Sequence, residues 1–313
     1  MSSKGALEML GAMAICGTIG ITVMASGQEE LSLIFYRCLF GALVLFAVCT
    51  ARRYLRRDLL TFKMVTGSLI GGAALIANWY FLFASYEKTS IGVATTVYNT
   101  QPIIMIALGF FLFKEKITAN VLVWTGVSLV GLLFISKLSG DDFGAGKASA
   151  YLIGVMQALL AAALYAVAAV FARLLKGNPP TLIALLQLLL GVAILWPYAD
   201  LDLIASPMLD KGTIATVLLG VVHTGFMYIL LYGALQKIEA YRAASISFIY
   251  PALAIAIDAG FLGVSLSVGQ WVGIGMILLG AAGINLKWSV SRFFRGSMGG
   301  TKDDQSQRAM GRQ

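Results

Sequence analysis

The sequence repeats itself with a shift of 149 residues. The two copies align without a gap over three marker pairs, which are Lys88 with Lys237, Ala94 with Ala243, and Pro102 with Pro251. Each copy contains five apolar stretches of membrane-spanning length, and an odd number of spans places the second copy in the membrane upside down. Inverted repeats of this kind are the architecture of many secondary transporters. The repeat therefore predicts an all-α membrane protein made of two inverted five-helix halves.

The composition agrees with a bilayer as the solvent. Hydrophobic residues make up 59% of the 313 residues and charged residues 12%, whereas soluble domains contain roughly 25% charged residues. A spanning helix needs about 20 mainly apolar residues. We therefore expect ten transmembrane helices, near residues 5–26, 30–50, 62–85, 90–113, 118–136, 149–173, 180–197, 212–235, 240–264 and 267–288.

The same pattern divides the chain into three parts. The N-terminal repeat is predicted to cover residues 1–138 and the C-terminal repeat residues 139–288. A glycine-containing stretch between them is expected to be a flexible hinge. Residues 289–313 are polar and rich in glycine, so we expect a disordered cytoplasmic tail there.

The positions of the basic residues predict the orientation. With the N-terminus in the cytoplasm, eighteen of the 23 lysines and arginines fall on the cytoplasmic side, four fall outside, and Arg37 is left within the second span. By the positive-inside rule both termini are then cytoplasmic, and basic residues of the tail can approach anionic lipid head groups. This placement explains the net charge of +8, so we expect no nucleic-acid partner.

Enzyme and metal motifs are absent from the sequence. It contains no His-Glu-x-x-His, no Gly-x-Ser-x-Gly and no Walker-type phosphate loop. A single histidine cannot build a conventional zinc site. We therefore expect no catalytic residues, no metal, no cofactor and no direct use of ATP.

Two prolines lie in the middle of predicted spans, at equivalent positions of the two repeats. Pro102 and Pro251 lie in the fourth and ninth helices, where a proline removes a backbone hydrogen bond and bends the helix axis. In a membrane the freed carbonyl needs another partner or a wet cavity. Pro102 and Pro251 are therefore candidate hinges, and conserved packing of an ancestral helix is the alternative.

Polar and aromatic side chains near these prolines mark a candidate substrate site. Hydrogen-bonding groups at mid-membrane depth are costly against lipid and are expected to face the bundle or a cavity. Aromatic residues of the third and eighth helices add flat walls with polar tips, which suit an amphipathic solute. The predicted substrate-binding residues are Trp79, Tyr80, Tyr98, Asn99, Gln101, Gln157, Tyr165, His223, Tyr228, Ser247 and Tyr250.

Three titratable residues within spans have more than one interpretation. His223, the only histidine, is a candidate proton relay or substrate ligand, and a neutral packing histidine is the alternative. Asp258 and Glu8 are candidates for proton coupling, because ionisable residues inside membranes often carry function. Asp258 can instead reach the interface, and Glu8 can pair with Arg37 or extend to the interface.

Glycines predict close packing of the fifth and tenth helices. Gly126 and Gly131 in one helix match Gly275 and Gly280 in the other, and small residues let membrane helices approach closely. The pattern fits a pair within the chain and a pair across a dimer equally well.

Several motifs resemble the drug/metabolite transporter superfamily. They are Phe35-Tyr-Arg37-Cys-Leu-Phe-Gly41 in the second helix, Ser85-Tyr-Glu-Lys88 and Ala94-x7-Pro102 around the fourth, Phe113-Lys-Glu115-Lys-Ile-Thr before the fifth, and Ala243-x7-Pro251 in the ninth. The resemblance covers about residues 5–288. Within the superfamily the chain is similar to the EamA-type exporters, and most to bacterial inner-membrane exporters of aromatic and other apolar amino acids. It departs from the internal symmetry because Glu115 has no counterpart before the tenth helix, and because Gln187 stands at the place of Arg37 when the shift is taken as 150 residues.

The resemblance implies a central cavity formed by helices 1–4 and 6–9, with helices 5 and 10 to one side. It also implies alternating-access export of small amphipathic metabolites, aromatic or apolar amino acids above all, across the bacterial inner membrane. The alternatives are a multidrug or quaternary-cation exporter, another metabolite exporter of the superfamily and, outside this class, a channel or an intramembrane enzyme. The expected partners are a small-molecule substrate and membrane lipids, and we expect a monomer or a weak homodimer.

Overall fold

The computed structural model describes residues 3–89, 91–135, 148–205, 210–262 and 266–289, and these are helical, without a β-strand. Nine helical stretches in this part are long and apolar enough to span a membrane, and Ala119–Ile135 is a shorter apolar helix that matches the predicted fifth span. The predicted all-α membrane fold is thus confirmed. The interhelical hinge at 137–147 and the tail from residue 290 onward lie outside the described residues.

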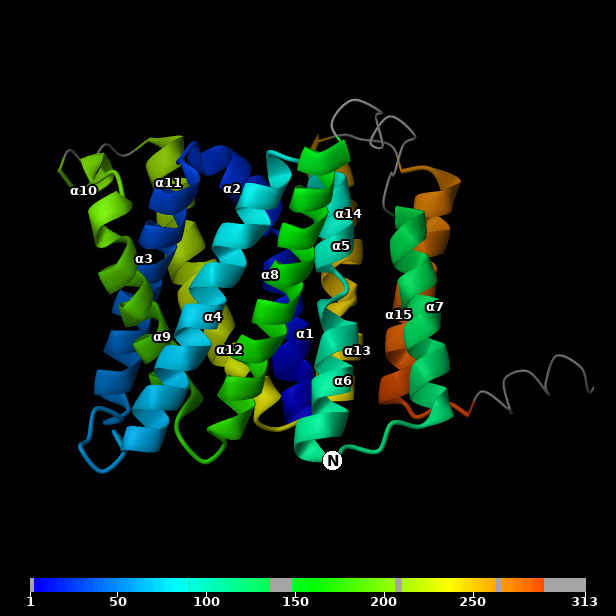
Figure 1. Cartoon of the computed structure of the whole chain (residues 1–313), viewed down its shortest axis with the longest axis horizontal. Helices are drawn as coiled ribbons and strands as arrows, with labels where there is room; N and C mark the ends of the chain where they lie inside the picture. Colours follow the sequence, from blue (N-terminus) through cyan, green and yellow to red (C-terminus); the bar gives the residue numbers. More distant parts are fainter. Residues whose placement is uncertain (1–2, 90, 136–147, 206–209, 263–265, 290–313) are drawn as a thin grey trace, which may run out of the picture.

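The helices follow each other in two series (Figure 1). The first series is α1 (Ser3–Gly17), α2 (Ile19–Ser26), α3 (Glu30–Ala51), α4 (Phe62–Tyr86), α5 (Ile91–Tyr98), α6 (Gln101–Phe113) and α7 (Ala119–Ile135). The second series is α8 (Ala148–Leu174), α9 (Pro180–Leu195), α10 (Asp202–Ala205), α11 (Lys211–Gly220), α12 (Met227–Leu235), α13 (Ala240–Ser247), α14 (Ile249–Leu262) and α15 (Val268–Asn285), with a 3₁₀ turn at Trp196–Tyr198 and a π-helical turn at Val221–Phe226.

Helices of the two repeats alternate within one bundle. α1 packs against α12, α3 against α9, and α4 against α8, so each of these contacts joins one repeat to the other. Phe35 and Ile183 are among the fully buried side chains that fill this inter-repeat core. Outward positions carry exposed apolar residues such as Leu43 and Phe111, which is the surface that lipid solvates.

The two repeats enter the bundle from opposite sides. α1 begins at the side marked N in Figure 1, which we call the N-terminal side. Gly154, close to the start of α8, lies against Lys88 and Thr89, which follow the end of α4 on the opposite side. The second repeat is therefore inverted relative to the first.

The fourth and ninth spans are interrupted just ahead of their prolines. α5 ends at Tyr98 before α6 begins at Gln101, and α13 ends at Ser247 before α14 begins at Ile249. The first turn of a helix has backbone N–H groups without partners, so a proline there removes no hydrogen bond. Each proline thus starts a new helix segment rather than bending a continuous one.

Two further interruptions have no counterpart in the other repeat. The first span breaks at Thr18, between α1 and α2, and the eighth span contains the π-helical turn between α11 and α12. The corresponding regions of α8 and α4 are continuous helices. Single π-helical turns inside membrane helices often mark functional positions.

α7 and α15 stand together at one side of the bundle (Figure 1). Gly131 lies against Gly273, and Gly280 lies against α7, so small residues bring the two backbones close as expected. The glycine pair therefore forms within the chain. Gly126 and Gly275 face open space and do not contribute to this contact. The prediction is therefore wrong for these two of the four glycines.

Candidate functional site

Five tyrosines from four spans lie near one another in the centre of the bundle. They are Tyr98, Tyr165, Tyr228, Tyr232 and Tyr250, and we call them the tyrosine cluster. The ring centroids of Tyr98 and Tyr165 are 6.3 Å apart, and those of Tyr228 and Tyr232 are 5.2 Å apart. The cluster brings together four residues that the sequence placed in the substrate site, from both repeats.

Buried amides hold the tyrosine cluster in place. Asn78, on α4, is fully buried, and its Nδ2 donates to the carbonyl oxygen of Ala161 at 2.7 Å and approaches the Tyr98 hydroxyl at 3.3 Å. The Tyr232 hydroxyl donates to Oε1 of Gln187 in a short hydrogen bond. Because buried polar groups need partners, these bonds fix both ring tips within an apolar bundle.

A buried arginine lies beside the tyrosine cluster. Arg37, on α3, is 4% exposed, and its Cζ lies 4.4 Å from the centroid of the Trp79 ring. Its Nε donates to Oγ1 of Thr224 at 3.2 Å. The Trp79 ring meets Tyr228 edge-on, with centroids 6.3 Å apart. Arg37, Trp79 and Thr224 form what we call the arginine corner, and Tyr228 connects it to the tyrosine cluster.

The guanidinium of Arg37 has no acidic partner within the described part of the chain. The ion pairs found there join other residues, and the hydrogen-bond acceptor of Arg37 is the Thr224 hydroxyl. The ionisable groups near it are phenols, thiols and one imidazole, namely Tyr228, Cys38, Cys16, Tyr98 and His223. A buried charge without a counter-ion is costly, so this position calls for a functional explanation.

Two irregular helix segments meet next to the arginine corner. The π-helical turn carries Thr224, whose hydroxyl donates to the carbonyl oxygen of Leu219 at 2.9 Å while it accepts from Arg37. It also carries His223, whose Nε2 lies 2.8 Å from Oγ1 of Thr18 at the break between α1 and α2. Interrupted helices at mid-membrane depth are a common setting for substrate and ion sites in transporters.

The protonation state of His223 is linked to one hydroxyl. Nδ1 lies 3.3 Å from the carbonyl oxygen of Leu218, and since a carbonyl only accepts, Nδ1 carries a proton. Oγ1 of Thr18 lies 2.8 Å from both Nε2 of His223 and the carbonyl oxygen of Ile15. If Thr18 donates to Ile15, Nε2 is also protonated and the ring is charged; if Thr18 donates to Nε2, the ring is neutral. A proton relay requires that the ring can change between its charged and its neutral form in this way.

Three glutamines have buried amide atoms without a partner among the described residues. Oε1 of Gln101, Oε1 of Gln157 and Nε2 of Gln187 make no hydrogen bond. Native structures leave few such atoms unsatisfied. Two acceptors and one donor are therefore free for a ligand or for water.

Three predicted binding residues do not join these central groups. Tyr80 is 47% exposed on the outer face of α4, because neighbouring residues of a helix point about 100° apart and Trp79 takes the inward direction. The structure thus places Tyr80 away from the centre, and its part in substrate binding stays a prediction. Asn99 and Ser247 are buried, but each side chain donates to the carbonyl four residues earlier in its own helix.

Two ion pairs join the repeats on the N-terminal side. The carboxylate oxygens of Glu8 lie 2.5 and 2.6 Å from Nζ of Lys237, so the alternative pairing of Glu8 with Arg37 is wrong. Glu115 pairs with Arg173 and also accepts a hydrogen bond from the backbone N–H of Ala240 at 2.9 Å. We call these the Glu8 latch and the Glu115 latch.

The local structure explains how Glu115 reaches the second repeat. Lys114 ends α6 in the left-handed conformation, with φ of 52°, and its N–H bonds the carbonyl oxygen of Gly109. The chain therefore turns back beneath the helix end, and Glu115 meets the N-terminus of α13 at Ala240 and Tyr241. A carboxylate at a helix N-terminus is stabilised by the helix dipole.

The opposite side is held differently. The ion pairs that the structure describes all lie on the N-terminal side. Gln157 and Lys88 occupy the repeat positions of Glu8 and Lys237. Nζ of Lys88 donates to the carbonyl oxygen of Ala84 at 3.3 Å, while Oε1 of Gln157 is unpaired. The two sides of the bundle, although related by the repeat, thus differ in the charged residues that hold them.

The centre is closed in this conformation. A narrow gap, too small for a water molecule, lies between tyrosines of the cluster and aliphatic side chains; its walls are Leu75, Tyr165, Ala168, Ala169, Tyr228, Leu231, Tyr232 and Leu235. Asp258 belongs to α14, and its side chain lies outside the described part of the structure.

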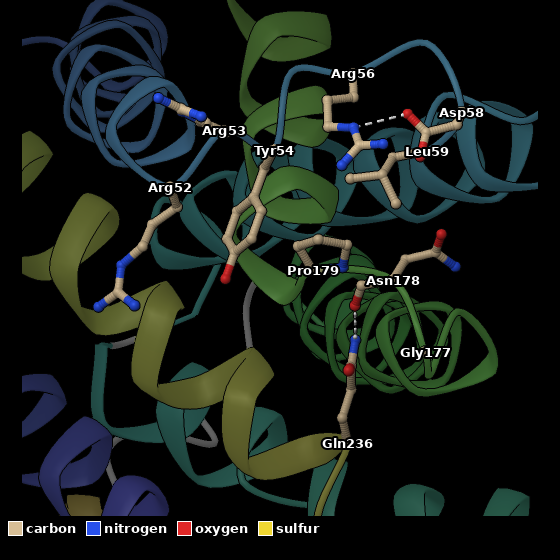
Figure 2. Close-up of a pocket in the computed structure, with 10 residues that line it drawn as sticks. All are labelled: Arg52, Arg53, Tyr54, Arg56, Asp58, Leu59, Gly177, Asn178, Pro179 and Gln236. Carbon is tan, nitrogen blue, oxygen red and sulfur yellow. Dashed lines mark hydrogen bonds and ion pairs between the residues drawn. The ribbon is translucent and has the colours of Figure 1, made fainter.

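An open hollow of about 460 Å³ lies on the N-terminal side (Figure 2). It is formed by residues 52–59 of the first repeat and residues 177–179 of the second, and Gln236 bridges toward Asn178, donating to its carbonyl oxygen at 3.3 Å. Arg56 pairs with Asp58 at 3.0 Å. None of the predicted binding residues lines this hollow, and its arginines belong to the basic side of the chain.

Sequence reasoning missed Arg37, Thr224 and Asn78 as members of the site. Arg37 carried a usable signal, because an ionisable residue inside a predicted span is a functional candidate by itself. Thr224 gave none, since its hydroxyl reaches Arg37 only through the π-helical turn.

The sequence and the fold of this chain are similar to those of a family of known proteins. The model of the EamA-like transporter family matches residues 3–137 and 152–286. The uncharacterized transporter YxxF of Bacillus subtilis is 30% identical over 281 residues, covering 90% of this chain and 89% of the relative. An uncharacterized transporter of Archaeoglobus fulgidus is 25% identical over 280 residues, covering 88% and 92%. A solved crystal structure superposes with a TM-score of 0.78 at 18% identity, covering 91% of this chain and 98% of the other, which shows the fold alone.

Proposed function

Because the chain belongs to the EamA-like transporter family, we propose that it exports small amphipathic metabolites, aromatic and apolar amino acids above all, by alternating access. The observation that carries this proposal is the combination of the tyrosine cluster with unpaired amide atoms at the interface of the two repeats. Aromatic rings provide apolar walls with polar tips, and the free amide atoms provide hydrogen bonds that fix orientation.

The walls of the central gap suit an apolar side chain. Leu231 and Leu235 face the gap together with the rings of Tyr165 and Tyr228. A solute that enters this space must be flat or aliphatic on one side. Outside this gap, the unpaired acceptors Gln101 Oε1 and Gln157 Oε1 suit an amino group, which brings only donors.

The latches support the proposal of alternating access. The Glu8 latch and the Glu115 latch cross from one repeat to the other on the N-terminal side, so this side is closed while they are intact. Opening it requires both pairs to separate, and the interrupted spans at Pro102 and Pro251 supply places where helix segments can reorient. Pro102 and Pro251 are the hinges of this proposal.

The N-terminal side is assigned to the cytoplasm by its charge. The loops at 52–57, 114–116 and 173–176 carry basic residues on that side, as the positive-inside rule requires. In a bacterium this corresponds to a multi-pass protein of the inner membrane with both termini in the cytoplasm, and a monomer has all the elements of the site.

Counterflow in proteoliposomes tests the proposal. Vesicles that contain purified protein are loaded with one unlabelled solute, and uptake of the same labelled solute is followed for L-phenylalanine, L-leucine, L-threonine, tetraphenylphosphonium and a nucleotide sugar. We expect accelerated uptake for the apolar amino acids. Exchange of tetraphenylphosphonium with no amino acid exchange would reject the amino-acid assignment in favour of a cation exporter.

A further inference from the structure

We propose that Arg37 binds the carboxylate of the transported solute, while the apolar side chain of that solute lies beyond Tyr228, where the closed gap widens to admit it. This inference rests on the proposed function and names the chemistry of its site. It starts from the unusual state of Arg37, which is 4% exposed and has a hydroxyl and an aromatic ring as its neighbours instead of an acid.

The free bonding capacity of Arg37 points to an oxygen anion. A guanidinium has five N–H donors in a planar fork, and Thr224 takes the one on Nε. The remaining donors are on the two terminal nitrogens, for which the described residues offer no hydrogen bond. Arginine forks match carboxylates in a bidentate geometry, and such charge-assisted bonds are the strong ones.

The surroundings hold the guanidinium ready for such a ligand. The Trp79 ring covers one of its faces at 4.4 Å, and a ring face attracts a cation without occupying its N–H donors. The Thr224 hydroxyl that accepts from Nε is itself fixed through its bond to Leu219. The plane of the fork is thus set before a ligand arrives, which reduces the entropy lost on binding.

The position of Tyr228 connects the two ends of the solute. One edge of its ring meets Trp79 in the arginine corner, and the same residue lines the central gap. A molecule with a carboxylate at Arg37 therefore extends past Tyr228 toward the gap. An α-amino acid or an aryl-substituted short carboxylic acid has this shape.

The charge of the centre selects against other substrate classes. Arg37 repels cations in a low-dielectric environment, where unit charges interact strongly. A phosphate dianion would need further permanently charged basic groups, and among the described residues Arg37 is the one lysine or arginine that interacts with Tyr98 and Tyr228. A single positive charge matches a monoanionic group, which is a carboxylate in amino acids.

The test compares acids with their amides. Purified full-length protein is titrated with L-phenylalanine, L-phenylalaninamide, 3-phenylpropionate and 3-phenylpropionamide, and binding is measured by competition and by thermal stabilisation. We expect each acid to bind about ten- to a hundredfold more tightly than its amide, the range of a charge-assisted bidentate contact. Replacement by R37Q is expected to abolish this preference, and R37K, which keeps the charge without the fork, to retain part of it.

R52Q is the matched control, because Arg52 ends the same helix at the exposed surface. It should leave the preference for acids unchanged. Size-exclusion profiles confirm that each variant is folded, and R37K provides the comparison if R37Q is not. The inference is overturned if the wild-type protein does not bind the acids, or binds them no more tightly than the amides. It is also overturned if R37Q still prefers the acids.

The two proposals fail separately. Preference for 3-phenylpropionate without any amino acid counterflow rejects the amino-acid assignment and supports the role of Arg37. Counterflow of L-phenylalanine at the same rate as its amide supports transport and rejects the role of Arg37.

Discussion

Glu115 is predicted to hold the N-terminal side closed more strongly than Glu8. The Glu115 side chain is 7% exposed and Arg173 is 17% exposed, so solvent screens this pair little. Removing one partner of a buried pair costs about 3–5 kcal/mol. In E115Q the amide oxygen can still accept from the N–H of Ala240, so we take the lower end, about 3 kcal/mol. That cost destabilises only the state in which the N-terminal side is closed. The equilibrium between the closed and the open state therefore shifts toward the open state by about a hundredfold.

The Glu8 latch gives the internal comparison. The Lys237 side chain is 37% exposed and Glu8 is 17% exposed. A pair with this exposure contributes about 0.5–1 kcal/mol, so E8Q should shift the same equilibrium only about two- to fivefold. The double variant E115Q/R173Q should shift it less than E115Q, since it leaves no unpaired buried charge.

Alkylation of Cys16 reports the opening. Cys16 is half-buried near the arginine corner and its thiol donates to the sulfur of Met227 at 3.2 Å. With Cys38 and Cys49 replaced by alanine, an impermeant maleimide is added to the cytoplasmic face of inside-out vesicles. The labelling rate should rise strongly in E115Q and slightly in E8Q. Equal rates in E115Q and the parent, or a larger effect in E8Q, would refute the account of the latches.

Three further predictions concern packing and the site. W79A should abolish or strongly reduce transport because Trp79 covers Arg37, whereas Y80A, its outward neighbour, should transport normally in the counterflow assay. G280L should lower the apparent melting temperature of purified protein by overpacking the contact between α7 and α15, worth about 1–3 kcal/mol, while G275L, which meets open space, should not. N78L should also melt earlier, since it removes the bond to Ala161, worth about 1 kcal/mol. Equal melting of G280L and G275L, or normal transport by W79A, would contradict these assignments.

Periodicity and repetition predicted the architecture because they act over many residues. Ten apolar stretches and the 149-residue register required only composition and spacing. The tyrosines were predictable for the same reason, since Tyr98 and Tyr228 lie on faces that hold polar groups at mid-membrane depth. Tyr80 was expected to face the centre and lies on the outer face instead, because two adjacent aromatic residues cannot both face inward on a straight helix.

The arginine corner depends on local backbone irregularities that could not be predicted from the sequence. The π-helical turn rotates Thr224 toward Arg37, and the break at Thr18 brings α1 to His223. Neither feature has a repeat counterpart, so the symmetry argument could not find them. The partner of Glu8 was equally hidden, because Lys237 lies 229 residues away in the chain.

Trans-stimulation of flux measures the central claim most directly. A carrier that alternates around a closed centre moves solute faster when it returns loaded, and its initial rate saturates with solute concentration. For wild-type protein in proteoliposomes, internal unlabelled L-phenylalanine should accelerate the uptake of labelled L-phenylalanine, with a saturable rate. Uptake that rises linearly with concentration and is unaffected by internal solute would show a channel and contradict alternating access.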